Sequence, residues 1–445
     1  MLKDYDKKKF IIADLYEKKY EMYEKYKEKY DEFFEVFDEY DYGADEFSCT
    51  PEEYKKSVVG DLKKGERFIL LKYSGQDESV KIPNGVTDIN ARAFLNNTKI
   101  RYVYIPNSVL SMGGNVFGDC TALEEVRLPI NLKLLTRETF YRCSSLKRVT
   151  IPDSVECIGI NAFDGCEMLT DIKFGKNIKS IGWDAFARCT SLKSIRLPDA
   201  LEEMDQNLFY KSSIEELYIP KGVNYIDPSA FSGCIKLKKV EVDPKNKKYC
   251  SQDNCVYNKE MTELLLCRND GKIINDGRLL SIEEDAFEVN DLIEEIDIPE
   301  GVESIGLASF RDCKNLKRVT LPKSLKRINR CAFERCSSLE EIIIPGSVKT
   351  IEGLSFIKTG LKRVIIKRGV ESINENAFAW CESLKEMYIP STIKDAHFPV
   401  GFKFECPKQN LHIYIEQSEE KNYENWIKSI EEFEYSFIKK SEIFD

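Results

Sequence analysis

The sequence predicts an α/β solenoid, in which stacked coils build a parallel β-sheet, with a helical segment at the N-terminus. Phenylalanine recurs at steps of 23 residues, with one step of 22 before Phe231 and a gap of 56 after it. The same apolar pattern returns around each Phe, while residues 3–40 have a different, helical spacing. The recurring residues are Phe94, Phe117, Phe140, Phe163, Phe186, Phe209, Phe231, Phe287, Phe310, Phe333, Phe356 and Phe378.

The repeated unit reads roughly L-x-x-V-x-I-P-x-x-V-x-x-I-x-x-x-A-F-x-x-C. In the copy that begins at Leu146, the spacing of Leu146, Val149 and Ile151 predicts a short strand with one buried face. Pro152 ends this strand because it has no N–H to donate to a ladder. Gly159 suits a turn, and the A-F-x-x-C portion predicts a short helical bend that returns the chain to the next strand.

Stacking of the coils builds the core. One coil cannot bury its own apolar edge, so neighbouring coils must cover one another. Equivalent residues then lie about 4.8 Å apart, and the Phe side chains form an internal column. We expect each buried ring to stabilise the fold by about 2 kcal/mol. A Phe→Ala substitution in the middle of the array should cost about 3–5 kcal/mol.

The elements L-K-x-V-x-I-P, S-V-x-x-I-G-x-x-A-F and x-C-x-S-L resemble the BspA-type leucine-rich repeat, over roughly residues 76–415. The resemblance implies a curved leucine-rich repeat array with a concave parallel β-sheet. It also implies binding of macromolecules, often as adhesins or surface proteins, without a family active site. Residues 243–271 resemble an insert of that family and imply a β-hairpin or two, with Val256, Tyr257, Leu264, Leu265 and Leu266 in strands.

The two ends differ from the repeats. Residues 3–40 contain Tyr and Phe at a spacing of four and three, without Pro or Gly, which predicts one amphipathic helix. The apolar face of such a helix must be buried, and three alternatives are open: it packs on the array, pairs with a second copy of the chain, or docks on another protein. Thr50 and Pro51 suit the start of a second short helix, and Phe68–Leu71 suit a strand of the N-terminal cap. Residues 410–433 resemble the family's closing strand and helix, with Leu411, Ile413 and Ile415 covering the last coil.

These expectations divide the chain into six segments. The first is an acidic, Tyr-rich amphipathic helix at 1–45, and the second is an N-terminal cap at 46–75. The repeats form a first block at 76–242 and a second block at 272–395, and the hairpin insert at 243–271 separates them. A C-terminal cap at 396–445 closes the array.

The residues that flank the centre of each repeat strand should face solvent on the concave sheet. Just before the centre, acidic and basic residues nearly alternate, which suits either a binding face or a ladder that neutralises itself. Just after the centre, the first block is basic and aromatic, and such side chains are common at binding hot spots. Chance composition is the alternative explanation. The candidate partner-binding residues are Tyr102, Tyr104, Arg127, Arg196 and Tyr218.

Cysteine and histidine offer little material for chemistry. Eight cysteines lie three residues after a column Phe, which predicts packed thiols. A metal site from Cys250, Cys255 and Cys267 is the alternative, but no fourth ligand is evident nearby. With only two His, and no phosphate-binding Gly loop, we expect no enzyme, no catalytic residues, no cofactor and no metal.

Charge and composition narrow the class of function. The net charge is −10, with −5 at each end (residues 1–45 and 416–445) and none between them, which argues against nucleic acid as a partner. No apolar run approaches the about 20 residues of a membrane span, and no signal peptide or anchor is visible. We therefore expect a cytoplasmic protein, although the resemblance allows the cell surface. The predicted function is a non-catalytic scaffold that binds a protein partner through the repeat surface. The alternative is a self-associating structural or adhesin-like protein, a homo-oligomer formed through residues 1–45.

Overall fold

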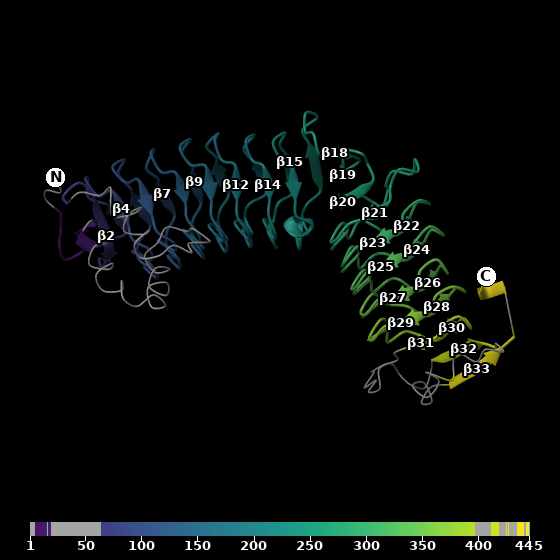
Figure 1. Cartoon of the computed structure of the whole chain (residues 1–445). Helices are drawn as coiled ribbons and strands as arrows, with labels where there is room; N and C mark the ends of the chain where they lie inside the picture. The colour runs from purple at the N-terminus through teal and green to yellow at the C-terminus, as the bar shows by residue number, and fades with distance from the viewer. Residues whose placement is uncertain are drawn as a thin grey trace, which may run out of the picture. The chain divides into compact units, whose positions relative to one another are not determined.

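The computed structural model describes residues 5–15, 17–18, 64–396, 411–417, 424, 426, 434–439 and 442–444. The chain forms two compact units, Met1–Lys236 (unit 1) and Leu237–Asp445 (unit 2). Within each unit the strands lie side by side as rungs of stacked coils (Figure 1). The prediction of a repeat solenoid with parallel sheets is confirmed within each unit.

In unit 1 every coil contributes a longer strand just before the repeat Pro position and a two-residue strand after it. The longer strands pair in parallel, the first five in one sheet and the last two in a second sheet, so that the central Val103 of one strand faces the central Val126 of the next. They are β3 (Ser79–Lys81), β5 (Tyr102–Tyr104), β7 (Glu125–Arg127), β9 (Arg148–Thr150), β11 (Asp171–Lys173), β13 (Ser194–Arg196) and β15 (Glu216–Ile219). The short strands are β4 (Asp88–Ile89), β6 (Ser111–Met112), β8 (Leu134–Leu135), β10 (Cys157–Ile158), β12 (Ser180–Ile181), β14 (Glu203–Met204) and β16 (Tyr225–Ile226).

The bend around each column Phe is built of turns, so the predicted helical bend is wrong. In the coil of Phe117, Asn115 and Asp119 have φ angles of 56° and 54°, which belong to the left-handed region and interrupt a right-handed helix. The backbone N–H groups of Asn115, Phe117 and Asp119 donate to the next coil, at 2.9, 3.0 and 2.8 Å. The turn thus adds another hydrogen-bonded ladder between coils. Only the last turn of unit 1 contains a 3-10 helix among its described residues, η2 (Pro228–Phe231).

The N-terminal helix prediction is wrong for Phe10–Asp14, although Leu15, Glu17 and Lys18 directly after them are helical. Phe10–Asp14 form strand β1, which pairs antiparallel with β2 (Phe68–Tyr73). The apolar run Phe10–Ala13 favours a strand because it covers the first coil, and the Phe10 ring lies 5.0 Å from the Tyr73 ring. Strand β2 agrees with the expected cap strand. The rest of the predicted helix from residue 19 onward, and the second helix from Thr50, lie outside the described residues.

Unit 2 repeats the two-strand coil. Its longer strands are β17 (Lys239–Val242), β22 (Glu295–Asp297), β24 (Arg318–Thr320), β26 (Glu341–Ile344), β28 (Arg363–Ile366) and β30 (Glu386–Ile389). Its short strands are β21 (Ser281–Ile282), β23 (Ser304–Ile305), β25 (Arg327–Ile328), β27 (Thr350–Ile351), β29 (Ser372–Ile373) and β31 (Asp395–Ala396).

The insert supplies three strands to unit 2, β18 (Tyr249–Gln252), β19 (Cys255–Asn258) and β20 (Glu263–Cys267). β18 pairs antiparallel with β19, and β19 with β20, while β20 pairs parallel with β21. The insert therefore extends the sheet of short strands instead of only projecting from the array. Val256 and Tyr257 lie in β19, and Leu264–Leu266 lie in β20, which are the strands expected from the resemblance.

The C-terminal cap covers the last coil with strand β32 (His412–Glu416), which pairs parallel with β30. Leu411, Ile413 and Ile415 are buried there, as predicted. β33 (Glu434–Ile438) pairs parallel with β32 and was not predicted. The 3-10 helix η5 (Glu442–Phe444) is held by the N–H of Arg368, which donates to the Phe444 carbonyl at 2.8 Å. Most of the expected closing helix lies outside the described residues.

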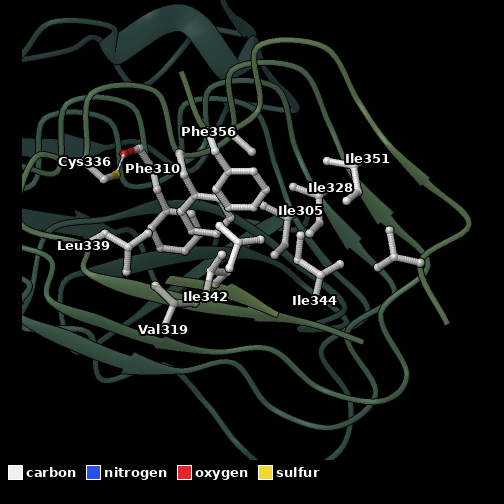
Figure 2. Packing of buried hydrophobic residues seen from close by; sticks show 14 of the residues in the cluster. Ile305, Phe310, Val319, Ile328, Cys336, Leu339, Ile342, Ile344, Ile351 and Phe356 are labelled. Carbon is white, nitrogen blue, oxygen red and sulfur yellow. Dashed lines mark hydrogen bonds between the residues drawn. The ribbon is translucent and has the colours of Figure 1, made fainter. Parts of the chain in front are cut away.

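The core of each unit contains the predicted column of Phe rings. In unit 1, neighbouring rings from Phe94 to Phe231 have centroids 5.0–6.5 Å apart. In unit 2, rings from Phe287 to Phe378 are 4.7–5.3 Å apart. Figure 2 shows the Phe310 and Phe356 rings beside Ile305, Ile328 and Ile351 of the short strands. Stacking at this distance buries apolar area and adds favourable aromatic contacts.

Candidate binding face

The longer strands of unit 1 present two columns of side chains on one exposed face. The central residue of each strand is buried, except for the half-buried Ile172, and because side chains alternate, the residues on either side of it point outward. We call the side chains after the centre the basic–aromatic row. It consists of Lys81, Tyr104, Arg127, Thr150, Lys173, Arg196 and Tyr218. The column before the centre contains Tyr102, Glu125, Arg148, Asp171, Ser194 and Glu216.

Tyr104 lies between two cations of the row. The guanidinium carbon of Arg127 is 4.9 Å from the centre of its ring, and the Lys81 ammonium is 5.4 Å away. Parallel pairing places Lys81 and Arg127 in the strands on either side of Tyr104. Tyr102, next to this group, has the guanidinium of Arg101 at 5.4 Å. These cation–π contacts hold the cationic groups in place at the exposed face.

None of the cations of the row forms an ion pair with a described residue, whereas Arg101 and Lys147 of unit 1 do. Arg101, which directly precedes Tyr102, forms an ion pair with Glu124. Lys147 pairs with the same Glu124 carboxylate, at 2.6 Å. These two partners lower the pKa of the Glu124 carboxyl. In the described part of unit 1, no such carboxylate pairs with Lys81, Arg127, Lys173 or Arg196. Their charge is therefore not neutralised by an ion pair within the described part of unit 1.

In unit 2 the column before the centre behaves as the self-neutralising ladder. Arg318 pairs with Glu295 at 2.7 Å, and it also reaches Asp297 at 2.8 Å. Arg363 lies between two carboxylates, with Glu341 and Glu386 both at 3.3 Å. The interpretation of alternating charges as a ladder is therefore confirmed in unit 2. Exposed pairs of this kind stabilise a fold by only about 0.2–1 kcal/mol each.

The five predicted binding residues fall into two groups on the same face. Tyr102, Tyr104 and Arg127 lie on the paired strands β5 and β7. Arg196 and Tyr218 face each other on β13 and β15. Strands β9 and β11 lie between the two groups in sequence, and they contribute Thr150 and Lys173 to the row.

Two further candidates of the row, Lys81 and Lys173, were not among the predicted residues. Lys81 belongs to the repeat copy that ends at the first column Phe, Phe94, and Val80, Lys81, Ile82 and Pro83 match the V-x-I-P element. That match was the signal that places Lys81 in register with Tyr104. Lys173 occupies the same column as Arg127 and Arg196 in the sequence.

The cysteines of the insert do not form the alternative metal set. Cys255 and Cys267 face each other on β19 and β20 and are joined by a disulfide. Cys250 is half-buried on β18, opposite Tyr257. Among the described residues, no three His, Cys, Asp or Glu side chains gather as metal ligands would.

Three solved structures with a similar fold are bacterial leucine-rich repeat proteins or antigens. A leucine-rich cell surface protein of Faecalibacterium prausnitzii is 22% identical with a TM-score of 0.57, over 81% of this chain and 93% of that chain. The pneumococcal vaccine antigen PcpA is 22% identical with a TM-score of 0.58, over 84% and 92%. A leucine-rich repeat protein of Bacteroides ovatus is 23% identical with a TM-score of 0.51, over 85% and 97%. A search of curated proteins gave no significant match.

The expectation of a cytoplasmic location gains no support from these comparisons. The protein of F. prausnitzii is described as a cell surface protein. In the part of the chain that the structure describes, no helix combines the length and the apolar character needed to cross a membrane.

The family model described as "BspA type Leucine rich repeat region" matches residues 71–185, 156–276 and 280–398. These ranges span most of the chain and contain the column Phe residues of both units. The first two ranges also include all seven strands that carry the basic–aromatic row in unit 1. The chain belongs to the BspA-type leucine-rich repeat family.

Proposed function

We propose that this chain is a non-catalytic scaffold that binds a protein partner through the exposed face of the longer strands of unit 1. Tyr102, Tyr104, Arg127, Arg196 and Tyr218 make the contacts. The observation that carries the proposal is the row of cations without an ion-pair partner among the described residues, beside aromatic rings. Aromatic and Arg side chains are the types that most often carry binding energy at protein interfaces.

A rigid scaffold lowers the cost of binding. Backbone ladders tie the strands that hold the row to their neighbours within two sheets, one from Lys81 to Lys173 and the other with Arg196 and Tyr218. Arg127 is further ordered by its contact with the Tyr104 ring. Side chains that are already ordered lose less conformational entropy when a partner binds.

The test is affinity purification from the native cell with the full chain and two double variants. Arg127→Ala with Arg196→Ala removes two cations of the row. Lys133→Ala with Lys179→Ala is the matched control, because both lysines are exposed, belong to unit 1 and lie outside the row. We expect a partner that the wild type and the control retain and the row variant loses. Equal recovery by both variants would contradict the proposal.

A third variant tests the alternative of self-association through the N-terminal segment. The deletion should cover residues 19–45 only, because β1 pairs with the cap strand β2 and must stay. Self-association predicts that this variant is monomeric where the full chain is oligomeric. Retention of the partner by the deletion variant supports binding on the repeats.

A further inference from the structure

The basic–aromatic row has a charge that its own strands do not balance. Lys81, Arg127, Lys173 and Arg196 are exposed, and the row itself contains no acidic side chain. In the adjacent column, the single cation Arg148 lies in register between Glu125 and Asp171. That column also contains Glu216 and has a net charge of −2, against +4 for the row, so an anionic ligand gains most where it follows the row.

The row also has a defined length. Lys81 and Arg196 are five coils apart, which at about 4.8 Å per coil gives a span of about 24 Å. An extended peptide rises about 3.4 Å per residue, so seven or eight residues cover the row. Lys173 and Arg196 are on consecutive coils, whereas Lys81, Arg127 and Lys173 are each two coils apart.

The side chains of the row favour a ligand with carboxylates over a ligand with bases or sugar rings. The cations at Tyr104 lie against its ring, at 4.9 and 5.4 Å, so this ring offers little open face for a nucleic acid base or a sugar to stack on. The guanidinium of Arg127, ordered by that contact, retains the donors of a fork that suits a carboxylate. The net charge of −10 of the chain further disfavours long polyanions such as nucleic acid.

We propose that the row recognises an extended acidic segment of a partner protein, about eight residues long, which lies across the longer strands of unit 1. This inference rests on the proposed function, since it names the chemistry of the partner of the same face. The carboxylates of the segment bind Lys81, Arg127, Lys173 and Arg196, and Thr150 and Tyr218 line its path.

The experiment uses fluorescently labelled octaglutamate, which spans about 27 Å when extended, and octaglutamine of the same length. Binding to the full chain is measured by anisotropy at low and at physiological salt. The variants are Arg127→Gln with Arg196→Gln, and the control Lys133→Gln with Lys179→Gln, which changes the net charge equally. We expect octaglutamate to bind more tightly than octaglutamine, the row variant to weaken binding about tenfold, and the control to change it less than twofold.

Three results would overturn the inference. The first is equal binding by both variants. The second is a sulfated polysaccharide or a single-stranded oligonucleotide of matched charge that binds more tightly than octaglutamate and depends on the same arginines. The third is binding of octaglutamate only to a variant in which the acidic residues within 31–47 are changed to amides. This stretch has eight acidic side chains and no Lys or Arg. Such a result would mean that the chain's own acidic stretch, and not a partner protein, is the ligand of the row. If octaglutamate fails while the row variant still loses a cellular partner, the proposed function stands and the acidic chemistry does not.

Discussion

The thiol of Cys143 donates a hydrogen bond to the backbone carbonyl of Phe117 in the preceding coil, at 3.1 Å. Eight thiols of the described residues repeat this contact, each with the Phe carbonyl of the preceding coil; Figure 2 shows Cys336 with Phe310. The donors are Cys120, Cys143, Cys166, Cys189, Cys234, Cys313, Cys336 and Cys381, at 3.1–3.3 Å. The cysteines thus connect coils as well as filling space.

Substitution of Cys143 separates these two contributions. Cys143→Ala removes the donor and leaves a small cavity, so we expect it to lower the free energy of unfolding by about 1–2 kcal/mol. Cys143→Ser keeps a donor, and Ser212 already occupies the same position in another coil, so it should cost less. Chemical denaturation of both variants measures the difference. Equal losses would mean that volume, and not the hydrogen bond, decides the stability at this position.

The buried thiols should also be unreactive toward alkylating reagents. Burial raises the pKa of the Cys120 and Cys313 thiols to about 12, and raises the pKa of Cys143 well above its usual value. The thiolate is the reactive form, so iodoacetamide at pH 8 should leave the column cysteines of the native protein unmodified. The half-buried Cys157 should be labelled first. Mass spectrometry of native and denaturant-treated protein checks this, and native labelling of Cys143 as fast as Cys157 would contradict it.

The periodic apolar positions made the solenoid, its Phe column and most strands predictable, because burial of one face imposes the same spacing on every coil. The thiol–carbonyl bonds were not predictable from spacing alone, since they depend on the direction of the Sγ atom. The strand β1 was missed because its short apolar run was absorbed into a longer helical pattern. In the candidate face, Lys81 was missed because its repeat copy has Asp77 where the other copies have an apolar residue, and no F-x-x-C element precedes it.

Val289 has an unfavourable backbone conformation, so a substitution at this position should stabilise the fold. It lies two residues after Phe287, where the turn requires the left-handed region, and its φ is 56°. A β-branched side chain is strained there, whereas Asn tolerates it, as Asn96 does at the same position of another coil with a φ of 61°. We expect Val289→Asn to stabilise the fold by about 1 kcal/mol. The melting temperature checks this. Asp312→Asn, at the equivalent position of the next coil, is the control and should have little effect.

Asp164 gives unit 1 a specific dependence on pH. Its side chain is 5% exposed and pairs with Arg188, but its Oδ1 atom has no hydrogen-bond partner among the described residues. Burial raises the pKa of the carboxyl to about 6, although Arg188 and Arg142 oppose the shift and Asp184 adds to it. The unfolded chain has a pKa of about 3.9. The folded protein therefore holds this proton more tightly than the unfolded chain.

The contribution of the protonated Asp164 to the free energy of unfolding is therefore fully present below about pH 4 and is lost as the pH rises through about 6. Above that pH the contribution no longer changes. Between these limits the free energy of unfolding of the wild type should fall by about 1–3 kcal/mol because of this group. Asp164→Asn cannot ionise, so we expect the variant not to show this fall. Chemical denaturation of wild type and variant at pH 4.5, 5.5, 6.5 and 7.5 measures the difference. Asp153→Asn is the control, because Asp153 is exposed and hydrogen bonds from Lys176 lower the pKa of its carboxyl. Parallel pH profiles for wild type and Asp164→Asn would show that the buried carboxyl does not set this dependence.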